Sequence, residues 1–322
     1  FIDIYLLNYS PAYKSGSSLN SYPNIILITI DATRADHLSL YGYHLNTTPN
    51  LNKLAEHSVV FDNAIAPGPD TQTSMASVLT GRYQYHHNTT LRNPVINEKE
   101  LFISEILKGK GYVTTGMISA VYIKSKYGAA QGFMEYKDRL DFFEYTQTYN
   151  KFSMKRLLDY VPGMRTFIFR TDGERKAEEI TKDAFRFLEK NSNNKFFLWM
   201  HYIEPHHPYN RGLQYRGMFS NERITLYDVW KTNKDIQLAT VYRPTPSYAI
   251  ERYIPIPNST IEMAKALYDA EIYSVDSNIG RLIGKLDQLG LKDKTMIIIT
   301  ADHGEEFYDH GGFMHHTLFN EN

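Results

Sequence analysis

The fold of this chain is constrained most by apolar runs that are rich in β-branched residues and too short to cross a membrane. Four such runs occur, at Asn24–Ile30, Tyr112–Ile118, Phe196–Met200 and Thr295–Thr300. Runs of this kind are typical of strands buried on both faces of a parallel sheet. Helical patterns lie between them, at Asn50–His57, Glu98–Lys108, Glu174–Lys190 and Ile261–Leu289. The alternation predicts an α/β fold, in which helices flank a large, mostly parallel central sheet.

Two segments fall outside this alternation. Residues 1–22 contain Ser10-Pro11 and a run of serine and glycine at 15–18, which predicts an N-terminal linker. The remaining residues, 23–322, are expected to form one α/β domain. Within it, residues 205–258 hold six of the 13 prolines, which predicts an irregular insertion over one end of the sheet.

Charge and cysteine content exclude several classes of protein. The 322 residues include 35 Lys and Arg against 36 Asp and Glu, and this balance argues against binding of nucleic acid through a basic surface. The absence of cysteine excludes disulfides, thiolate metal sites and a cysteine nucleophile. The chain begins with Phe1, so a signal or membrane anchor upstream of residue 1 stays open. An extracytoplasmic or membrane-associated location is favoured.

Polar residues follow three of the predicted strands. Asp31 follows the first strand, His201 the third, and Asp302-His303 come after Thr300 and Ala301. Ligands of parallel sheets bind at the carboxyl ends of the strands, so this pattern predicts a divalent-metal site. Each residue alone has a plainer interpretation. Asp31 would be a helix N-cap, Asp302-His303 a turn, and His201 a packed histidine.

A second group of histidines, His310, His315 and His316, lies in the glycine-containing stretch Asp309–Thr317. A loop of this kind has no core to fill, so the imidazoles are candidates for binding an anion or a metal. The plainer interpretation is a solvated loop.

The candidate nucleophile is a threonine. Two prolines and a glycine form a loop at 67–69, and a Thr/Ser cluster then starts a short helix that Gly81 ends. Thr71 or Thr73 could serve simply as its N-cap. Alternatively, a hydroxyl at a helix N-terminus meets an anion near free N–H groups, and a divalent cation lowers the pKa of that hydroxyl.

Taken together, several segments resemble the sulfatase family of the alkaline phosphatase superfamily. They are Pro23–Tyr43, Thr48–Leu54, Thr71–Arg82, His201–Tyr209, Leu267–Leu289 and Thr300–Thr317. The resemblance implies an α/β sandwich around a large central sheet. It also implies a divalent-metal site that cleaves sulfate or phosphate esters through a covalent intermediate.

The resemblance also implies roles for individual residues. Asp31, Asp302 and His303 would bind the metal, and Thr71 stands at the position of the nucleophile, where it would also contact the metal. His206 matches a histidine that contacts the substrate oxyanion or the leaving group. His315 lies near the position of an active-site lysine or histidine. His201 and His316 are weaker candidates.

The departures from the family pattern concern the nucleophile first. Formylglycine is made from Cys or Ser in a Cys/Ser-x-Pro-x-Arg motif, whereas residues 71–75 read Thr-Gln-Thr-Ser-Met. Threonine is the nucleophile of related phosphoryl-transfer enzymes, so the resemblance is to a type that does not use formylglycine. Ala32 stands where a second carboxylate often follows Asp31. The chain ends at Asn322, so we expect it to lack the C-terminal region of the family.

These observations predict a sulfatase-like ester hydrolase that cleaves sulfate or phosphate esters through a covalent Thr71 intermediate. The expected cofactor is a divalent cation, with Ca²⁺, Mn²⁺ and Zn²⁺ left open, and the expected substrate is a small molecule or an ester on a glycan or lipid. Two alternatives stay open. One is a membrane-associated transferase of the phosphoethanolamine or phosphoglycerol type, and the other is a catalytically decayed binding protein on the same fold.

Overall fold

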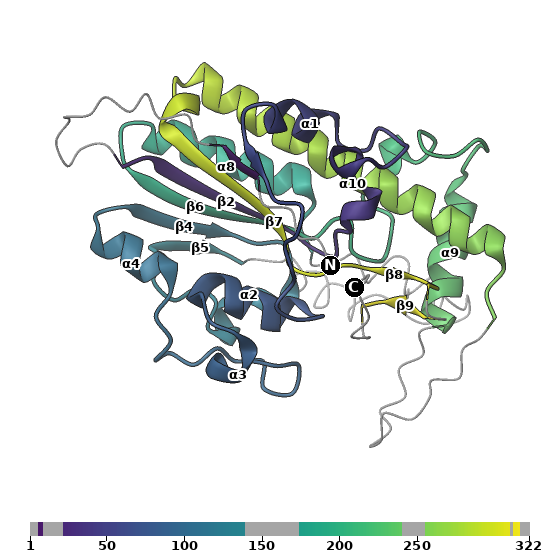
Figure 1. The fold of residues 1–322 in the computed structure, drawn as a ribbon, viewed down its shortest axis with the longest axis horizontal. Coiled ribbons are helices and arrows are strands. Elements are labelled where there is room, and N and C mark those ends of the chain that lie inside the picture. The colour runs from purple at the N-terminus through teal and green to yellow at the C-terminus, as the bar shows by residue number, and fades with distance from the viewer. Residues whose placement is uncertain (1–5, 9–21, 139–173, 240–254, 310–311, 316–322) are drawn as a thin grey trace, which may run out of the picture.

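The computed structural model describes residues 6–8, 22–138, 174–239, 255–309 and 312–315. In this part of the chain, seven strands form one sheet in the order β3-β1-β7-β2-β6-β4-β5 (Figure 1). The strands are β1 (Leu6–Asn8), β2 (Asn24–Ile30), β3 (Val59–Val60), β4 (Val113–Met117), β5 (Glu135–Lys137), β6 (Phe196–Tyr202) and β7 (Thr295–Ala301). Strands β7, β2, β6, β4 and β5 are parallel, whereas β1 pairs antiparallel with β7 and β3. The predicted α/β architecture is confirmed.

Helices cover both faces of this sheet. On one face lie α1 (Pro49–Ala55), α8 (Ala177–Asn191) and the long α10 (Asn258–Gln288), and on the other lie α2 (Thr71–Thr80), α3 (Gln84–His87) and α4 (Ile103–Gly109) (Figure 1). A further helix, α9 (Leu226–Ala239), lies beside α10, and a small hairpin pairs β8 (Glu306–Phe307) with β9 (Phe313–Met314). Short 3-10 turns occur at Ala35–His37, Ser39–Tyr41, Val121–Ile123, Ser125–Tyr127, Leu213–Tyr215 and Lys292–Lys294.

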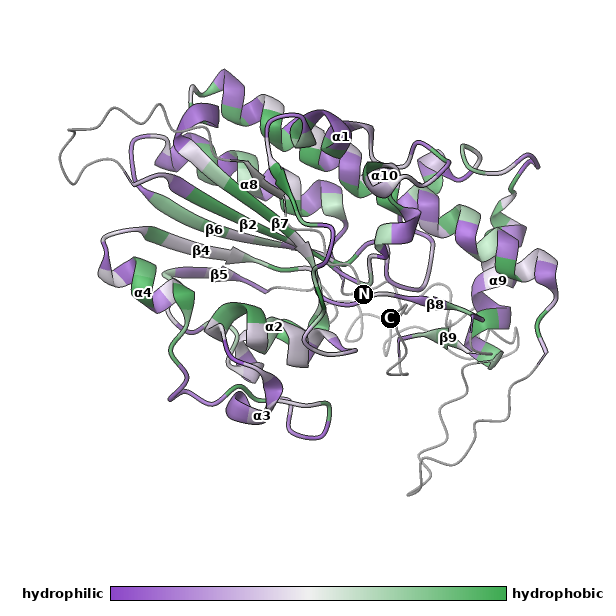
Figure 2. Ribbon diagram, viewed as in Figure 1, coloured by the Kyte–Doolittle hydropathy of each residue, from purple (hydrophilic) through white to green (hydrophobic). Residues whose placement is uncertain are grey.

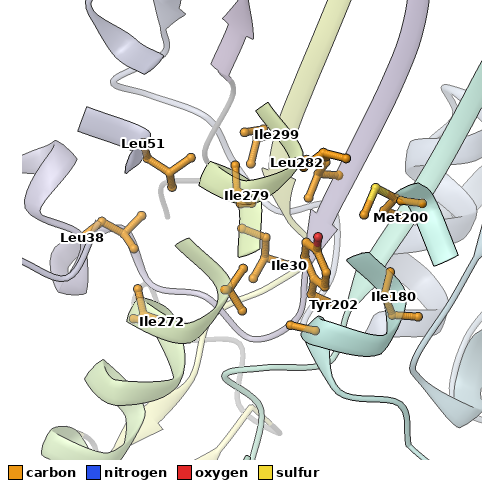
Figure 3. Close-up of a cluster of buried hydrophobic side chains, with 14 of the residues drawn as sticks. Ile30, Leu38, Leu51, Ile180, Met200, Tyr202, Ile272, Ile279, Leu282 and Ile299 are labelled. Atoms are coloured by element: carbon orange, nitrogen blue, oxygen red, sulfur yellow. The ribbon is translucent and has the colours of Figure 1, made fainter. Parts of the chain in front are cut away.

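The alternation of side chains along each strand gives the sheet two hydrophobic cores. Ile26, Ile28 and Ile30 of β2 pack toward α1, α8 and α10, whereas Leu27 packs toward α2 and α4. Figure 3 shows Ile30 among residues of this first core. Successive strand residues point to opposite faces, so a central strand covered on both sides must be apolar throughout. Figure 2 accordingly shows β2, β6 and β7 as mainly hydrophobic, while α8 and α10 carry both kinds of residue. None of the helices in the described residues has the length and apolar character that a membrane crossing requires.

Four expectations were wrong in detail. Strand β6 continues to Tyr202, because its backbone pairs with β2 as far as Ile30, so His201 lies inside the strand and not after it. Leu6–Asn8 were assigned to the linker but form β1. The fourth helical pattern is longer than expected, beginning at Asn258, and α4 begins only at Ile103.

The predicted irregular insertion is also partly wrong, because residues 226–239 form α9. Thr225 and Asp228 supply its start. The Thr225 N–H donates to Asp228 Oδ2 at 2.8 Å, and the Asp228 N–H donates to Thr225 Oγ1 at 3.2 Å. This reciprocal capping box corresponds to Thr-x-x-Asp in the sequence. Residues 240–254 of the predicted insertion, and most of the predicted linker, lie outside the described residues.

Removal of a central side chain is expected to cost a large part of the stability. Ile28 is completely buried between β6, β7 and the helices, so Ile28→Ala should lower the free energy of unfolding by about 2–5 kcal/mol. Ile65→Ala is the matched control, because Ile65 is 70% exposed and its truncation should change stability by less than about 0.5 kcal/mol. Denaturant unfolding measures the free energy of unfolding of both variants. Equal losses in the two variants would contradict the burial of Ile28 in the core.

Candidate active site

The two carboxylates of the site stand at adjacent strand ends. Strands β2 and β7 are in register from Asn24 to Ile30, so Asp31 and Asp302 follow directly after paired residues. Asp302 Oδ1 accepts hydrogen bonds from the N–H groups of Ala32 (3.1 Å) and His303 (2.8 Å). The other oxygen, Asp302 Oδ2, and Asp31 Oδ1 are buried and accept no hydrogen bond from the described residues. Burial of an oxygen without a hydrogen bond lowers the stability of the folded chain, unless a water molecule or a cation interacts with that oxygen.

His303 adds a third acceptor at the same place. Its Nδ1 lies 2.9 Å from Gly304 O, so in the neutral ring Nδ1 carries the proton and Nε2 has the lone pair. That Nε2 atom lies 3.5 Å from Asp31 Oδ1 and 3.5 Å from Asp302 Oδ2. The ligand atoms of the three residues lie within 4.8 Å of one another, and all three residues are buried. A proton fixed on the far ring nitrogen by a carbonyl is the usual arrangement of a metal-binding histidine.

The electrostatics favour a cation at this point. Burial raises the pKa of Asp31 well above its ordinary value, and the charge of Asp302 raises it further. Desolvation and like charge both oppose ionisation, whereas a divalent cation between the carboxylates would reverse both effects. The donor set therefore fits a metal ion, with two carboxylates and one imidazole as ligands.

Thr71 is the first residue of α2 and reaches the same group. The N-cap of α2 is Asp70, which accepts a hydrogen bond from the Thr73 N–H at 2.9 Å and another from Thr73 Oγ1 at 2.8 Å. The simpler interpretation of Thr71 or Thr73 as the N-cap is therefore wrong. Thr71 Oγ1 lies 3.3 Å from His303 Nε2, and Gly81 ends the helix in the left-handed region, with a φ of 66°. The first turn of α2 thus presents a hydroxyl to the candidate metal ligands.

His206 and His315 form a pair beside this group. The Nδ1 atoms donate to backbone carbonyls, His206 to His207 O at 2.5 Å and His315 to Pro69 O at 2.7 Å. Their Nε2 atoms lie 3.1 Å apart. The ring of His315 also stacks on that of His303, with centroids 4.0 Å apart. Burial lowers the pKa of His206 well below its ordinary value, which favours the neutral ring with its proton on Nδ1.

The weaker candidates have different outcomes. His201 is buried in β6, with Nε2 3.4 Å from Asp31 Oδ2 and Nδ1 2.8 Å from Thr29 Oγ1. Burial lowers its pKa to about 4, so the ring is neutral and packs against the back of Asp31. The plainer interpretations of Asp31 as a helix cap and of Asp302-His303 as a simple turn do not fit these contacts. His310 and His316 lie outside the described residues.

Sequence analysis missed Arg211, which lies between the His206 segment and α10. It is 4% exposed and donates hydrogen bonds to His206 O and Pro208 O. No spacing or composition marks this arginine in the sequence, because its partners are backbone carbonyls and distant carboxylates.

Comparison with known proteins identifies the group to which this geometry belongs. The Sulfatase family matches residues 23–321. The chain belongs to the sulfatase family. This family generally uses a divalent metal ion, and Asp31, Asp302 and His303 form a candidate site for one.

The relatives of this sulfatase-family chain are distant but match most of its length. It is 28% identical to the iduronate 2-sulfatase of Mus musculus over 94% of this chain and 58% of the relative. It is 26% identical to the N-acetylglucosamine-6-O-sulfatase of Bacteroides thetaiotaomicron over 93% of this chain and 61% of the relative. The chain thus spans less than two thirds of the length of both proteins. The crystal structure of the phosphonate monoester hydrolase of Agrobacterium radiobacter has the same fold, with a TM-score of 0.68, 19% identity, and coverage of 93% of this chain and 66% of that one.

Loss of one carboxylate oxygen should abolish metal binding. In Asp302→Asn, the amide oxygen still accepts from Ala32 and His303, but an NH₂ group replaces the free Oδ2. We expect the affinity for Ca²⁺, Mn²⁺ or Zn²⁺ to fall by at least about 100-fold, measured by calorimetry after chelation. Asp293→Asn removes one charge at an exposed position and should leave the affinity unchanged. Equal affinities of the two variants would exclude the site.

The metal-free chain should become less stable as the pH rises. Because the pKa of Asp31 is raised above 3.8 on folding, the native state keeps a proton that the unfolded state has released. Its contribution is therefore fully present below the unfolded pKa and is lost as pH rises through the folded pKa. Denaturant unfolding with a chelator, from about pH 4 to about pH 8, should show a shallower decline in Asp31→Asn than in the wild type. Glu271, whose pKa burial raises to about 8, contributes equally to both proteins. Parallel declines would contradict this account.

Proposed function

We propose that this chain hydrolyses sulfate or phosphate esters, with Thr71 as the nucleophile that carries the covalent intermediate. The observation that supports this most directly is the position of Thr71 Oγ1, 3.3 Å from the Nε2 atom that also faces Asp31 and Asp302. A hydroxyl at a helix start thereby meets three candidate metal ligands from two strand ends. Membership of the sulfatase family supports ester hydrolysis as the type of reaction.

Two displacements account for the reaction. In the first, the proton of the Thr71 hydroxyl passes to solvent, Thr71 Oγ1 attacks the sulfur or phosphorus, the bond to the alcohol oxygen breaks, and the alcohol leaves with a proton from the histidine pair. In the second, water attacks the same atom and gives up a proton, the bond to Thr71 Oγ1 breaks, sulfate or phosphate is released, and Thr71 Oγ1 regains a proton from solvent. A divalent cation bound by Asp31, Asp302 and His303 would lower the pKa of the Thr71 hydroxyl and offset charge on the ester oxygens. The first-turn N–H groups of α2 favour negative charge at the same end of the helix.

The His206–His315 pair is the proposed source of the proton for the leaving alcohol. Because both Nδ1 atoms donate to backbone carbonyls, the two Nε2 atoms are the ones that exchange protons. The pair enters the first displacement with one proton, taken from solvent, between its two Nε2 atoms, and gives this proton to the leaving oxygen. It takes a proton from water in the second displacement. The contact of His315 with the His303 ring keeps this proton beside the proposed nucleophile.

The proposed nucleophile is unmodified threonine. The chain has no cysteine, and position 71 is not serine, so the residues from which formylglycine is made are absent from this position. A formylglycine hydrate releases sulfate by elimination, whereas a threonine ester lacks the second hydroxyl that elimination needs. The threonine intermediate must therefore be resolved by attack of water at sulfur or phosphorus.

Sulfated sugars are the first substrates to test. Two relatives that match over most of this chain are named iduronate 2-sulfatase and N-acetylglucosamine-6-O-sulfatase. We propose a sulfate ester on a glycan as the substrate class, with aryl sulfates and phosphate esters as reporters.

The Thr71 hydroxyl is expected to be essential for turnover. In the metal-loaded chain, Thr71→Ala should lower kcat on aryl sulfate or aryl phosphate by at least about 1,000-fold, because no attacking oxygen remains. Thr80→Ala is the matched control from the same helix, since the hydrogen bonds of Thr80 Oγ1 to the described residues go to its local backbone, at Ala76 O and the Arg82 N–H. Its kcat should equal that of the wild type.

Two results would contradict the proposal in different ways. Full turnover by Thr71→Ala would exclude the nucleophile but retain the hydrolase. Metal binding without turnover of any sulfate, phosphate monoester or phosphate diester would favour a decayed binding protein. A transferase would release the alcohol of the ester but keep the sulfate or phosphate group on the chain until an added acceptor alcohol removes it.

A further inference from the structure

Arg211 holds the backbone of the segment that carries His206. This segment, residues 203–212, is here called the histidine loop, and it follows β6 directly. The Arg211 Nη1 atom donates to two carbonyls of the loop, His206 O at 2.9 Å and Pro208 O at 3.1 Å. One guanidinium nitrogen thus contacts the peptide group that precedes His207 and the one that follows Pro208. The His206 ring is set by the same backbone, because its Nδ1 donates to His207 O.

Two carboxylates from other parts of the fold hold Arg211 itself. Glu174, from the segment before α8, forms an ion pair with Nη2. Glu271, from α10, accepts the Arg211 backbone N–H at 2.6 Å through Oε1, and its Oε2 lies 4.0 Å from Nη1. The Arg211 and Glu271 side chains are each 2% exposed. A buried guanidinium with partners on several sides has little freedom to move, because each departure leaves a buried charge unpaired.

We propose that Arg211 is a positioning residue that sets His206 Nε2 against His315, in support of the proton transfer of the proposed function. The guanidinium joins the histidine loop to Glu174 in the segment before α8 and lies 4.0 Å from Glu271 of α10, a helix whose buried residues share a core with β2 and β6. Its planar fork serves two carbonyls and a carboxylate together, which the single ammonium of lysine does not reproduce. The 3.1 Å contact between His206 and His315 therefore depends on a residue that does not touch either ring.

A purely structural role for Arg211 is the competing explanation, and Arg216 provides the matched control. Arg216 is half-buried and also donates to two backbone carbonyls, Leu213 O at 2.6 Å and Ile224 O at 3.1 Å. Neither carbonyl belongs to the histidine loop. Removal of Arg216 therefore tests the loss of a carbonyl-binding arginine in the same region without a change at His206.

The first experiment measures kinetics on the metal-loaded chain with an aryl sulfate or aryl phosphate reporter. Arg211→Lys keeps a positive charge between Glu174 and Glu271 but loses the planar guanidinium that donates several hydrogen bonds. Arg211→Gln loses both the charge and the guanidinium. We expect kcat to fall by about 10- to 100-fold in Arg211→Lys, because a small displacement of a catalytic group has this effect. KM should stay within about threefold of the wild type, since the proton transfer and not substrate binding is impaired. Arg216→Lys should change neither constant.

A double-mutant cycle tests whether Arg211 acts through His206. His206→Gln removes the proton donor, so adding Arg211→Lys should cause little further loss of kcat. Losses that multiply would show that Arg211 acts independently of His206 and would overturn the proposal. The thermal midpoint of each variant is measured in parallel. Arg211→Gln leaves Glu174 and Glu271 without their cationic partner, so this variant can fail to fold. In that case the kinetics of Arg211→Lys alone decide between the positioning role and its absence.

The second experiment does not require activity. In the full chain labelled with ¹⁵N-histidine, the Nδ1–H proton of His206 should be protected and shifted downfield by its bond to His207 O, and His206→Gln assigns it. We expect this signal to move or disappear in Arg211→Lys and to persist in Arg216→Lys. An unchanged signal in Arg211→Lys would overturn the proposal. Failure of the wild type to cleave any ester, with the signal lost only in Arg211→Lys, would refute the proposed function and retain the positioning role.

Discussion

The carboxyl groups of Asp31 and Asp302 and the Nε2 atom of His303 face one small volume, and ionisation of both carboxyl groups places two like charges there. This convergence follows from the parallel pairing of β2 with β7, which ends both strands at the same level. In the absence of a cation the arrangement is repulsive, and burial makes the repulsion stronger. A cation in this volume would offset the repulsion, and the other side chains of the site lie around that position.

The orientation of the imidazoles is set by the main chain. His206, His303 and His315 each place Nδ1 against a backbone carbonyl, of His207, Gly304 and Pro69 respectively. In all three rings this leaves Nε2 directed toward the other side chains of the site. The tautomers are thereby fixed by groups that do not titrate. Side chains from a strand end, from the histidine loop and from the segment after β9 meet in this way.

The strands, the main helices and the convergence of Asp31, Thr71, Asp302 and His303 could be predicted from the sequence. Parallel strands bring their carboxyl ends together, so a residue that follows an apolar run can be placed without coordinates. Three features could not be predicted. The extension of β6 past His201 depends on pairing with β2. Helix α9 lies in a stretch whose prolines predict irregular structure. Arg211 acts through backbone carbonyls, which carry no sequence signature. Such contacts depend on tertiary structure, which local patterns do not encode.

Strand β1 has a consequence for where this protein can be cut. The three residues Leu6–Asn8 pair with Ile297, Ile298 and Ile299 of β7, on the side of β7 opposite β2. The family match begins at residue 23, which invites a truncation there. Such a truncated chain would leave the outer side of β7 with unpaired amide and carbonyl groups along a row of isoleucines, next to Asp302 and His303. An uncovered edge of this kind is a template for intermolecular strand addition. Aggregation of a shortened product would then reflect a lost edge strand and not a defective core.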